Sequence, residues 1–173
     1  ATLVMLLAPG ALITRSRLER FAWFCWAFAV WDLFYYVFLK VLLGWPESFL
    51  TWDVLFLLPT VWVGPVLAPC LVSAGLLMLA GVLLHARSAW PGYRPAFRRW
   101  PPLVAAAGLM LYTFMEEPLR LAMEGAPGNG IGTNFIDRLS NYSPRTFQWP
   151  IFLVACVIAA WAVSGMAKDG RPR

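Results

Sequence analysis

The sequence predicts an all-α, polytopic integral membrane protein with about four transmembrane helices in one domain. Of its 173 residues, 60% are hydrophobic and only 13% are charged, whereas a typical soluble domain is about 45–50% apolar and about 25% charged. The apolar residues also gather in runs of roughly 20, the length that crosses a bilayer as a helix. Ten tryptophans add a third observation, since Trp concentrates at membrane–water interfaces.

The first span is predicted at 21–43. The apolar segment before it, 1–14, is too short to cross alone and is interrupted by Pro9 and Gly10. It is expected to be an interfacial helix, part of a span, or the remnant of a trimmed leader. Within 21–43 the only formal charges are Asp32 and Lys40. Lys40 is near the far end and can extend its charge to the interface, whereas Asp32 is near the middle.

A polar turn over 44–53 separates this span from 31 apolar residues at 54–84, too many for one straight span. The prolines in this run each remove a helical hydrogen bond; they are Pro59, Pro65 and Pro69. The pattern predicts a proline-broken or re-entrant segment over 54–69 and a full span at about 64–84. A single tilted, kinked helix is the alternative.

The remaining elements follow from the same pattern. A basic cytoplasmic loop is expected at 85–101, and a third span at about 102–122, which requires the helix to continue through two adjacent glutamates. An extracytoplasmic loop is expected over 116–148, and the last span at about 149–166.

The distribution of basic residues predicts the orientation. With four spans, one side of the membrane receives ten arginines and lysines and the other side three, and the richer side is expected to be cytoplasmic. The ten are Arg15, Arg17, Arg20, Arg87, Arg94, Arg98, Arg99, Lys168, Arg171 and Arg173. We therefore expect a multi-pass protein of the bacterial inner membrane with both termini cytoplasmic. Because these residues flank apolar runs instead of forming one face, nucleic acid is not an expected partner.

Asp32 is the first candidate for chemistry, because a carboxylate at mid-span costs several kcal/mol unless it is paired, protonated or turned inward. It could relay a proton or cation, or it could form a structural hydrogen bond to a neighbouring helix. Lys40 is too far around the helix for a direct pair. The second candidate is the broken segment with Pro59, Pro65 and Pro69, since transporters place their sites at helix breaks, although kinks that only shape packing are commoner.

Two further candidates are weaker. Glu116 and Arg120 have the i,i+4 spacing of a helical ion pair, and a solvated helix end is the simplest interpretation. His85 ends the second main span and could supply a single ligand to a cofactor held by a partner, or simply be an interfacial polar residue. The chain has only this histidine, and each of its three cysteines lies inside an apolar run. No metal site, disulfide or cofactor is therefore predicted from this chain alone, whereas contact with lipid or pigment is left open.

A set of aromatic, proline and aspartate residues between Trp31 and Pro69 resembles a motif of small, functionally uncharacterised bacterial inner-membrane proteins. The matching residues are Trp31-Asp32, Phe34-Tyr35-Tyr36, Gly44-Trp45-Pro46, Thr51-Trp52-Asp53, Pro59 and Gly64-Pro65. The resemblance covers less than a quarter of the chain. It implies a bacterial membrane setting and no particular reaction.

Two functions compete. The first is a non-catalytic accessory or structural subunit of a larger membrane complex, for example an energy-converting, photosynthetic or respiratory one, in contact with lipid and with other membrane subunits. The second is a small transporter or intramembrane enzyme that uses Asp32 and the Pro59–Pro69 helix break. No catalytic constellation of known spacing is present, so the sequence favours a chain that is not an enzyme and leaves the question open.

Overall fold

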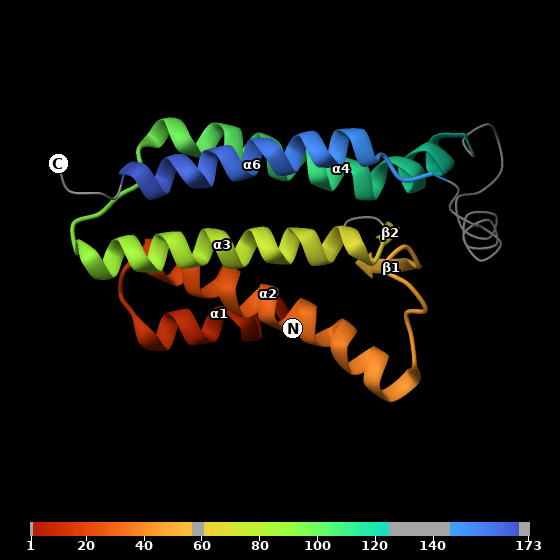
Figure 1. The fold of residues 1–173 in the computed structure, drawn as a ribbon, viewed down its shortest axis with the longest axis horizontal. Helices are drawn as coiled ribbons and strands as arrows, with labels where there is room; N and C mark the ends of the chain where they lie inside the picture. Colours follow the sequence, from red (N-terminus) through yellow and green to blue (C-terminus); the bar gives the residue numbers. More distant parts are fainter. Residues whose placement is uncertain (1, 57–60, 125–145, 170–173) are drawn as a thin grey trace.

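The computed structural model describes residues 2–56, 61–124 and 146–169. Long helices lie side by side along one axis, with a small two-stranded sheet at one end (Figure 1). The elements are α1 (Thr2–Ile13), α2 (Arg17–Leu43), β1 (Trp52–Phe56), β2 (Trp62–Pro65), α3 (Leu67–Ala89), the 3-10 turn η1 (Phe97–Arg99), α4 (Trp100–Glu124) and α6 (Trp149–Asp169). Among the described helices, α2, α3 and α6 are long and apolar enough to cross a membrane.

The ends of α2 follow from local sequence signals. Ser16 is the N-cap, and its side chain accepts a hydrogen bond from the backbone N–H of Glu19, three residues on, in the Ser-x-x-Glu pattern of a helix start. At the other end Gly44 has a φ of 70°, and its N–H bonds to the carbonyl of Lys40. Only glycine adopts this left-handed conformation without strain, which is why the helix ends there.

Residues after the turn at 44–51 form an antiparallel hairpin, so the all-α prediction is wrong for this segment. Strand β1 pairs with β2, with Trp52 opposite Pro65 and Val54 opposite Val63. Aromatic and β-branched residues favour strands, and Pro65 ends its strand, where a missing N–H removes little of the ladder. The alternative of one kinked helix over 54–84 is excluded.

Helix α3 begins at Leu67, directly after the hairpin. The backbone N–H groups of Val66 and Leu67 donate to carbonyls of the preceding turn, those of Thr51 and Phe49, at 2.9 and 2.8 Å. Pro69 lies in the first turn of α3, where a helix has no intrahelical partner for the N–H. The predicted span at 64–84 is thus a helix at 67–89.

The helices form two pairs. Helix α2 packs along α3, α4 along α6, and α3 against α6, while α1 packs on α2 (Figure 1). The largest core cluster joins α2, α3, α6 and the loop after α3, and it is rich in alanine, which allows helices to approach closely. Its buried members are Ala22, Cys25, Leu79, Ala80, Leu83, Ala86, Tyr93, Val163 and Met166.

Burial declines along α2. Ala22 and Ala29 are fully buried against α3, whereas Val41 and Leu43 near the C-terminal end are more than 70% exposed. In Figure 1 the second half of α2 leans away from α3 toward the end that carries the hairpin. The two helices therefore form a wedge that is closed at one end and open toward the other.

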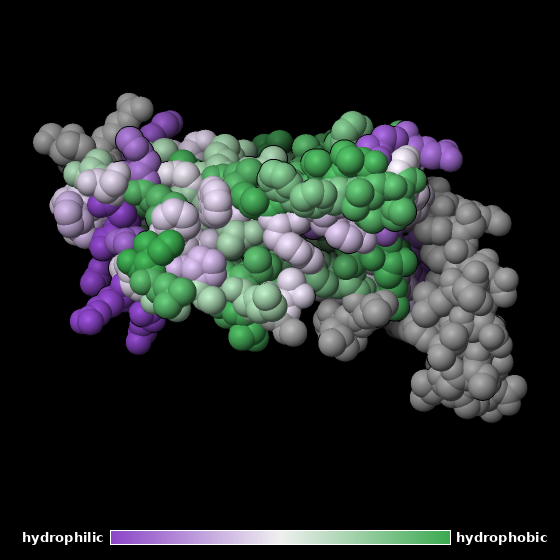
Figure 2. Space-filling view, turned by 90° about the horizontal axis from the view of Figure 1, so that it is seen from below, coloured by the Kyte–Doolittle hydropathy of each residue, from purple (hydrophilic) through white to green (hydrophobic). Residues whose placement is uncertain are grey.

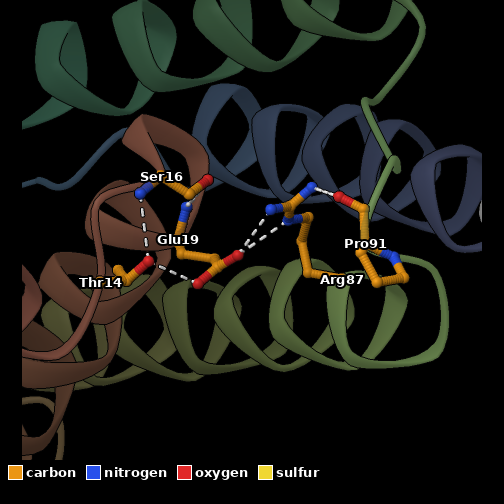
Figure 3. Close-up of polar contacts among 5 residues, drawn as sticks. All are labelled: Thr14, Ser16, Glu19, Arg87 and Pro91. Carbon is orange, nitrogen blue, oxygen red and sulfur yellow. Dashed lines mark hydrogen bonds and ion pairs between the residues drawn. The ribbon is translucent and has the colours of Figure 1, made fainter.

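The closed end is basic and is held by polar contacts. Glu19 of α2 accepts hydrogen bonds from Thr14 at 2.7 Å and from Arg87 of α3 at 2.8 Å, and Arg87 also donates to the carbonyl of Pro91 (Figure 3). At the same end Arg99 lies 3.3 Å from Asp169. Figure 2 shows hydrophilic residues gathered at this end of the molecule, a mixture of hydrophobic and intermediate residues along the middle, and a smaller hydrophilic patch near the opposite end.

Helix α4 continues without interruption through the two adjacent glutamates and Pro118 to Glu124, as the predicted third span requires. The first part of the predicted loop at 116–148 is accordingly helical, and its part at 125–145 lies outside the described residues. Helix α1 has 12 residues, and its Thr2 end lies beside the middle of the bundle, not at either end (Figure 1).

Candidate functional site: a polar cavity between α2, α3 and the hairpin

Asp32 faces the interior of the protein. Its exposed fraction is only 8%, and the hydroxyl of Ser73 on α3 donates to its Oδ2 atom at 2.8 Å. Ser73 is itself buried. The packing of α2 on α3 therefore brings together two polar side chains that are 41 residues apart. Helix α2 carries this carboxyl group toward the interior, where a charged group is costly unless it finds partners.

A second carboxyl group joins the site through Tyr36. This tyrosine follows Asp32 by one helical turn and so lies on the same face of α2. Its hydroxyl donates to Oδ2 of Asp53 on β1 at 3.0 Å, and the N–H of Val54 donates to Oδ1 of Asp53 at 2.8 Å. Burial raises the pKa of Asp53 above its usual value, and these two donors act in the opposite direction.

These groups line a cavity of about 230 Å³ between α2, the hairpin and α3. Half of the residues that line it are aromatic. Phe28 stacks on Phe56 with ring centroids 6.4 Å apart, and Phe56 meets Trp62 edge to face at 5.1 Å. The indole N–H of Trp62 is buried and has no acceptor among the described residues. A buried donor without a partner is rare in folded proteins and calls for an explanation.

The cavity carries acidic groups without a matching cation. Of the described residues that line it, two are aspartates and none is basic, and no ion pair joins Asp32 or Asp53 to a described residue. Lys40, eight residues beyond Asp32, directs its ammonium group to the carbonyls of Gly44 and Pro46 at 3.1 and 2.8 Å. This geometry agrees with the sequence inference that Lys40 does not pair with Asp32.

The three candidate prolines have different positions. Pro69 lines the cavity from the first turn of α3. Pro65 ends β2 and does not line the cavity. Pro59 lies outside the described residues. The prediction of a site at a helix break is therefore replaced by a cavity where a hairpin meets the start of a helix. The backbone groups beside Pro65 are satisfied by the turn at 49–51, and no spanning helix is broken there.

The other candidates lie away from the cavity. Arg120 has an ion pair with Glu117 at 3.6 Å, and its predicted pairing with Glu116 stays a prediction. His85 is exposed near the basic end of α3. Cys25, Cys70 and Cys156 are free thiols. No cluster of three or more metal-ligating side chains exists among the residues that the structure describes.

Sequence reasoning identified Asp32 but missed its companions. Tyr36 was visible in principle, because it stands four residues after Asp32 and therefore shares its face. Ser73 is a polar residue inside an apolar span, which is also a usable signal. Asp53 fell within the predicted polar turn at 44–53. Asp53 lies at the cavity because it is on a strand of the hairpin. The sequence pattern predicts only helices and a turn in this region, so Asp53 could not be placed there from the sequence.

The arrangement can bind a positive charge or hold protons, because carboxylates in a partly enclosed, low-dielectric site attract cations strongly. The hydroxyl groups of Ser73 and Tyr36 each donate to a carboxyl group. Searches of protein-family models, of curated proteins and of solved structures found no match to this chain.

Proposed function

We propose that this chain is a four-crossing membrane protein that binds a cationic solute or proton in the Asp32 cavity and moves it across the membrane. The observation that carries the proposal is Asp32 itself, 8% exposed on a spanning helix and without a cationic partner among the described residues. An acid in such a position marks an ion or proton pathway by default. Asp53 adds a second carboxyl group to the same cavity.

In this proposal α4 is the fourth crossing. Its 25 residues correspond to a helix of about 37 Å, longer than the roughly 30 Å hydrocarbon core. It runs alongside α6, which is apolar enough to span. The basic end, with Arg87, Arg98 and Arg99, faces the cytoplasm of a bacterial inner membrane according to the positive-inside rule. The hairpin and the cavity then lie toward the outer side.

Uptake into liposomes tests the transport function. The full chain would be reconstituted and supplied separately with protons, sodium, rubidium and methylammonium, with Asp32→Asn and Glu47→Gln as the test and control variants. Glu47 is an exposed acid outside the Asp32 cavity. We expect at least one of these cations to move in the wild type and the control and not in Asp32→Asn. Equal fluxes in all three proteins, or none in any, would refute the proposal.

A second candidate function is the accessory subunit, and a separate surface favours it. An apolar groove of about 280 Å³ runs between α3, α4 and α6 and includes small residues such as Gly75, Ala107 and Ala159. A Cβ atom added at Gly75 would contact nothing within 4 Å, so this face is open for a helix of another subunit to approach closely. Gly75→Leu should then remove the partner from gently extracted complexes and leave cation uptake unchanged.

A further inference from the structure

The composition of the Asp32 cavity indicates more than a preference for positive charge. Half of the residues that line it are aromatic: Phe28, Trp31, Tyr35, Tyr36, Phe56, Trp62 and Phe114. The negative faces of such rings attract cations, and aromatic cages with an acidic residue are the usual recognition device for ammonium groups. Neither of the two carboxyl groups has a cationic partner among the described residues, so both are available to balance the positive charge of a ligand.

The size of the cavity limits the ligand. About 230 Å³ is the space of roughly seven or eight water molecules, at about 30 Å³ each. Pockets for drug-sized molecules begin at about 300 Å³. A small organic ion fits within this space.

A bare metal ion fits the wall less well. Mg²⁺ and Ca²⁺ require about six or more oxygen ligands at short range. The hydroxyl groups of Ser73 and Tyr36 already donate to the two carboxyl groups, and most of the remaining wall is ring carbon. A weakly hydrated organic cation loses little on contact with such rings.

We propose that the Asp32 cavity binds a small organic ammonium ion, with Asp32 and Asp53 as counter-charges and the aromatic rings as walls. This inference rests on the proposed function, which supplies the premise that a cation occupies the cavity. It adds the chemical class of that cation. The ammonium group lies between the two carboxyl groups, and its alkyl groups contact Phe28 and Phe56.

Equilibrium binding of radiolabelled tetramethylammonium to the purified full chain in lipid nanodiscs tests this. We expect saturable binding at one ion per chain. Asp32→Asn should weaken it at least about tenfold, and Phe56→Leu should weaken it about 3- to 30-fold by removing a cation–π contact. The matched controls are Glu47→Gln and Phe38→Leu, of which Phe38 is 57% exposed on the outer face of α2; both should bind like the wild type.

Three results would overturn the inference: no saturable binding, equal binding in both cavity variants and the wild type, or equal losses in cavity variants and controls. If Asp32→Asn does not fold, Asp53→Asn and Phe56→Leu carry the test. Binding is measured without a membrane gradient, so it is independent of transport. Saturable binding without flux would refute the transport function alone, whereas Asp32-dependent flux of sodium or protons without tetramethylammonium binding would refute the ligand class alone.

Discussion

The contact between Glu19 and Arg87 gives a prediction that the structure makes quantitative. Oε1 of Glu19 lies 2.8 Å from both Nε and Nη2 of Arg87, and Thr14 donates to the other carboxylate oxygen. The side chains of Arg87 and Glu19 are only 20% and 25% exposed. This pair joins the start of α2 to the end of α3, so its loss should destabilise the closed end of the wedge.

The magnitude lies between two limits. A hydrogen bond to a charged group contributes about 1.5–3 kcal/mol when shielded from water, and a fully exposed ion pair about 0.2–1 kcal/mol. At this partial exposure we expect a coupling free energy of about 1–1.5 kcal/mol between Glu19 and Arg87. A change of 1 kcal/mol lowers the Tm of a chain of this size by about 2–4 °C.

A double-mutant cycle measures the coupling. Glu19→Gln, Arg87→Gln and the double variant would be compared with the wild type by thermal unfolding in one detergent, because the cycle isolates the pairwise contribution. Glu47→Gln, an exposed acid near the hairpin, is the control and should not change the Tm. A coupling below about 0.3 kcal/mol, the usual limit of additivity, would show that the contact does not hold α2 to α3.

Three other predictions follow from close contacts and from burial. In Gly165→Ala the new Cβ would overlap the guanidinium group of Arg99. This group is the far end of a flexible side chain and can move aside, so the change should cost only its ion pair with Asp169 and lower the Tm by no more than about 3 °C. In an Arg99→Ala background the same change should have no effect. In Gly64→Ala the Cβ would lie 2.9 Å from the ring of Phe114, and thermal unfolding should show a loss of about 1–3 kcal/mol. Because burial raises the pKa of Asp53, tetramethylammonium affinity should fall as the pH drops through that raised value. The decline should begin above the pH at which an exposed aspartate takes up its proton, and Asp53→Asn should flatten it. Among the polar and charged groups that face Asp53 are the hydroxyl of Tyr36 and the carboxyl of Asp32.

The helices were predictable because membrane spans depend on a simple quantity, the length of an apolar run. The first span was predicted at 21–43, and α2 covers Arg17–Leu43; the last was predicted at 149–166, and α6 covers Trp149–Asp169. The cap at Ser16, three residues before Glu19, also carried a recognisable signal. In each case the relevant information lies within about 25 consecutive residues.

The hairpin could not be predicted in the same way. Apolar runs of four to eight residues do not distinguish a strand from a buried helix by periodicity. Strand β2 lies inside a longer apolar run, and β1 begins with Trp52 and Asp53 in the predicted polar turn. Beside the pairing of these strands, the backbone N–H groups of Val66 and Leu67 donate to the carbonyls of Thr51 and Phe49, a contact between segments that are distant in the sequence. The bond between Asp32 and Ser73 depends on the packing of α2 on α3, which no single segment of the sequence specifies.

Because α2 and α3 are in contact at the basic end and diverge toward the hairpin, a rigid-body tilt of α2 about a pivot at the basic end would displace its far half most. Tyr36 lies 14 residues beyond Ala22, about 21 Å along a rigid helix, so a tilt of ~5° about that pivot would move Tyr36 by ~2 Å. Asp32, nearer the pivot, would move by little more than ~1 Å. A small rotation at the clamped end thus separates Tyr36 from Asp53 before it separates Asp32 from Ser73. Asp53 on the hairpin would lose its hydroxyl donor first, and Asp32 would lose its donor second.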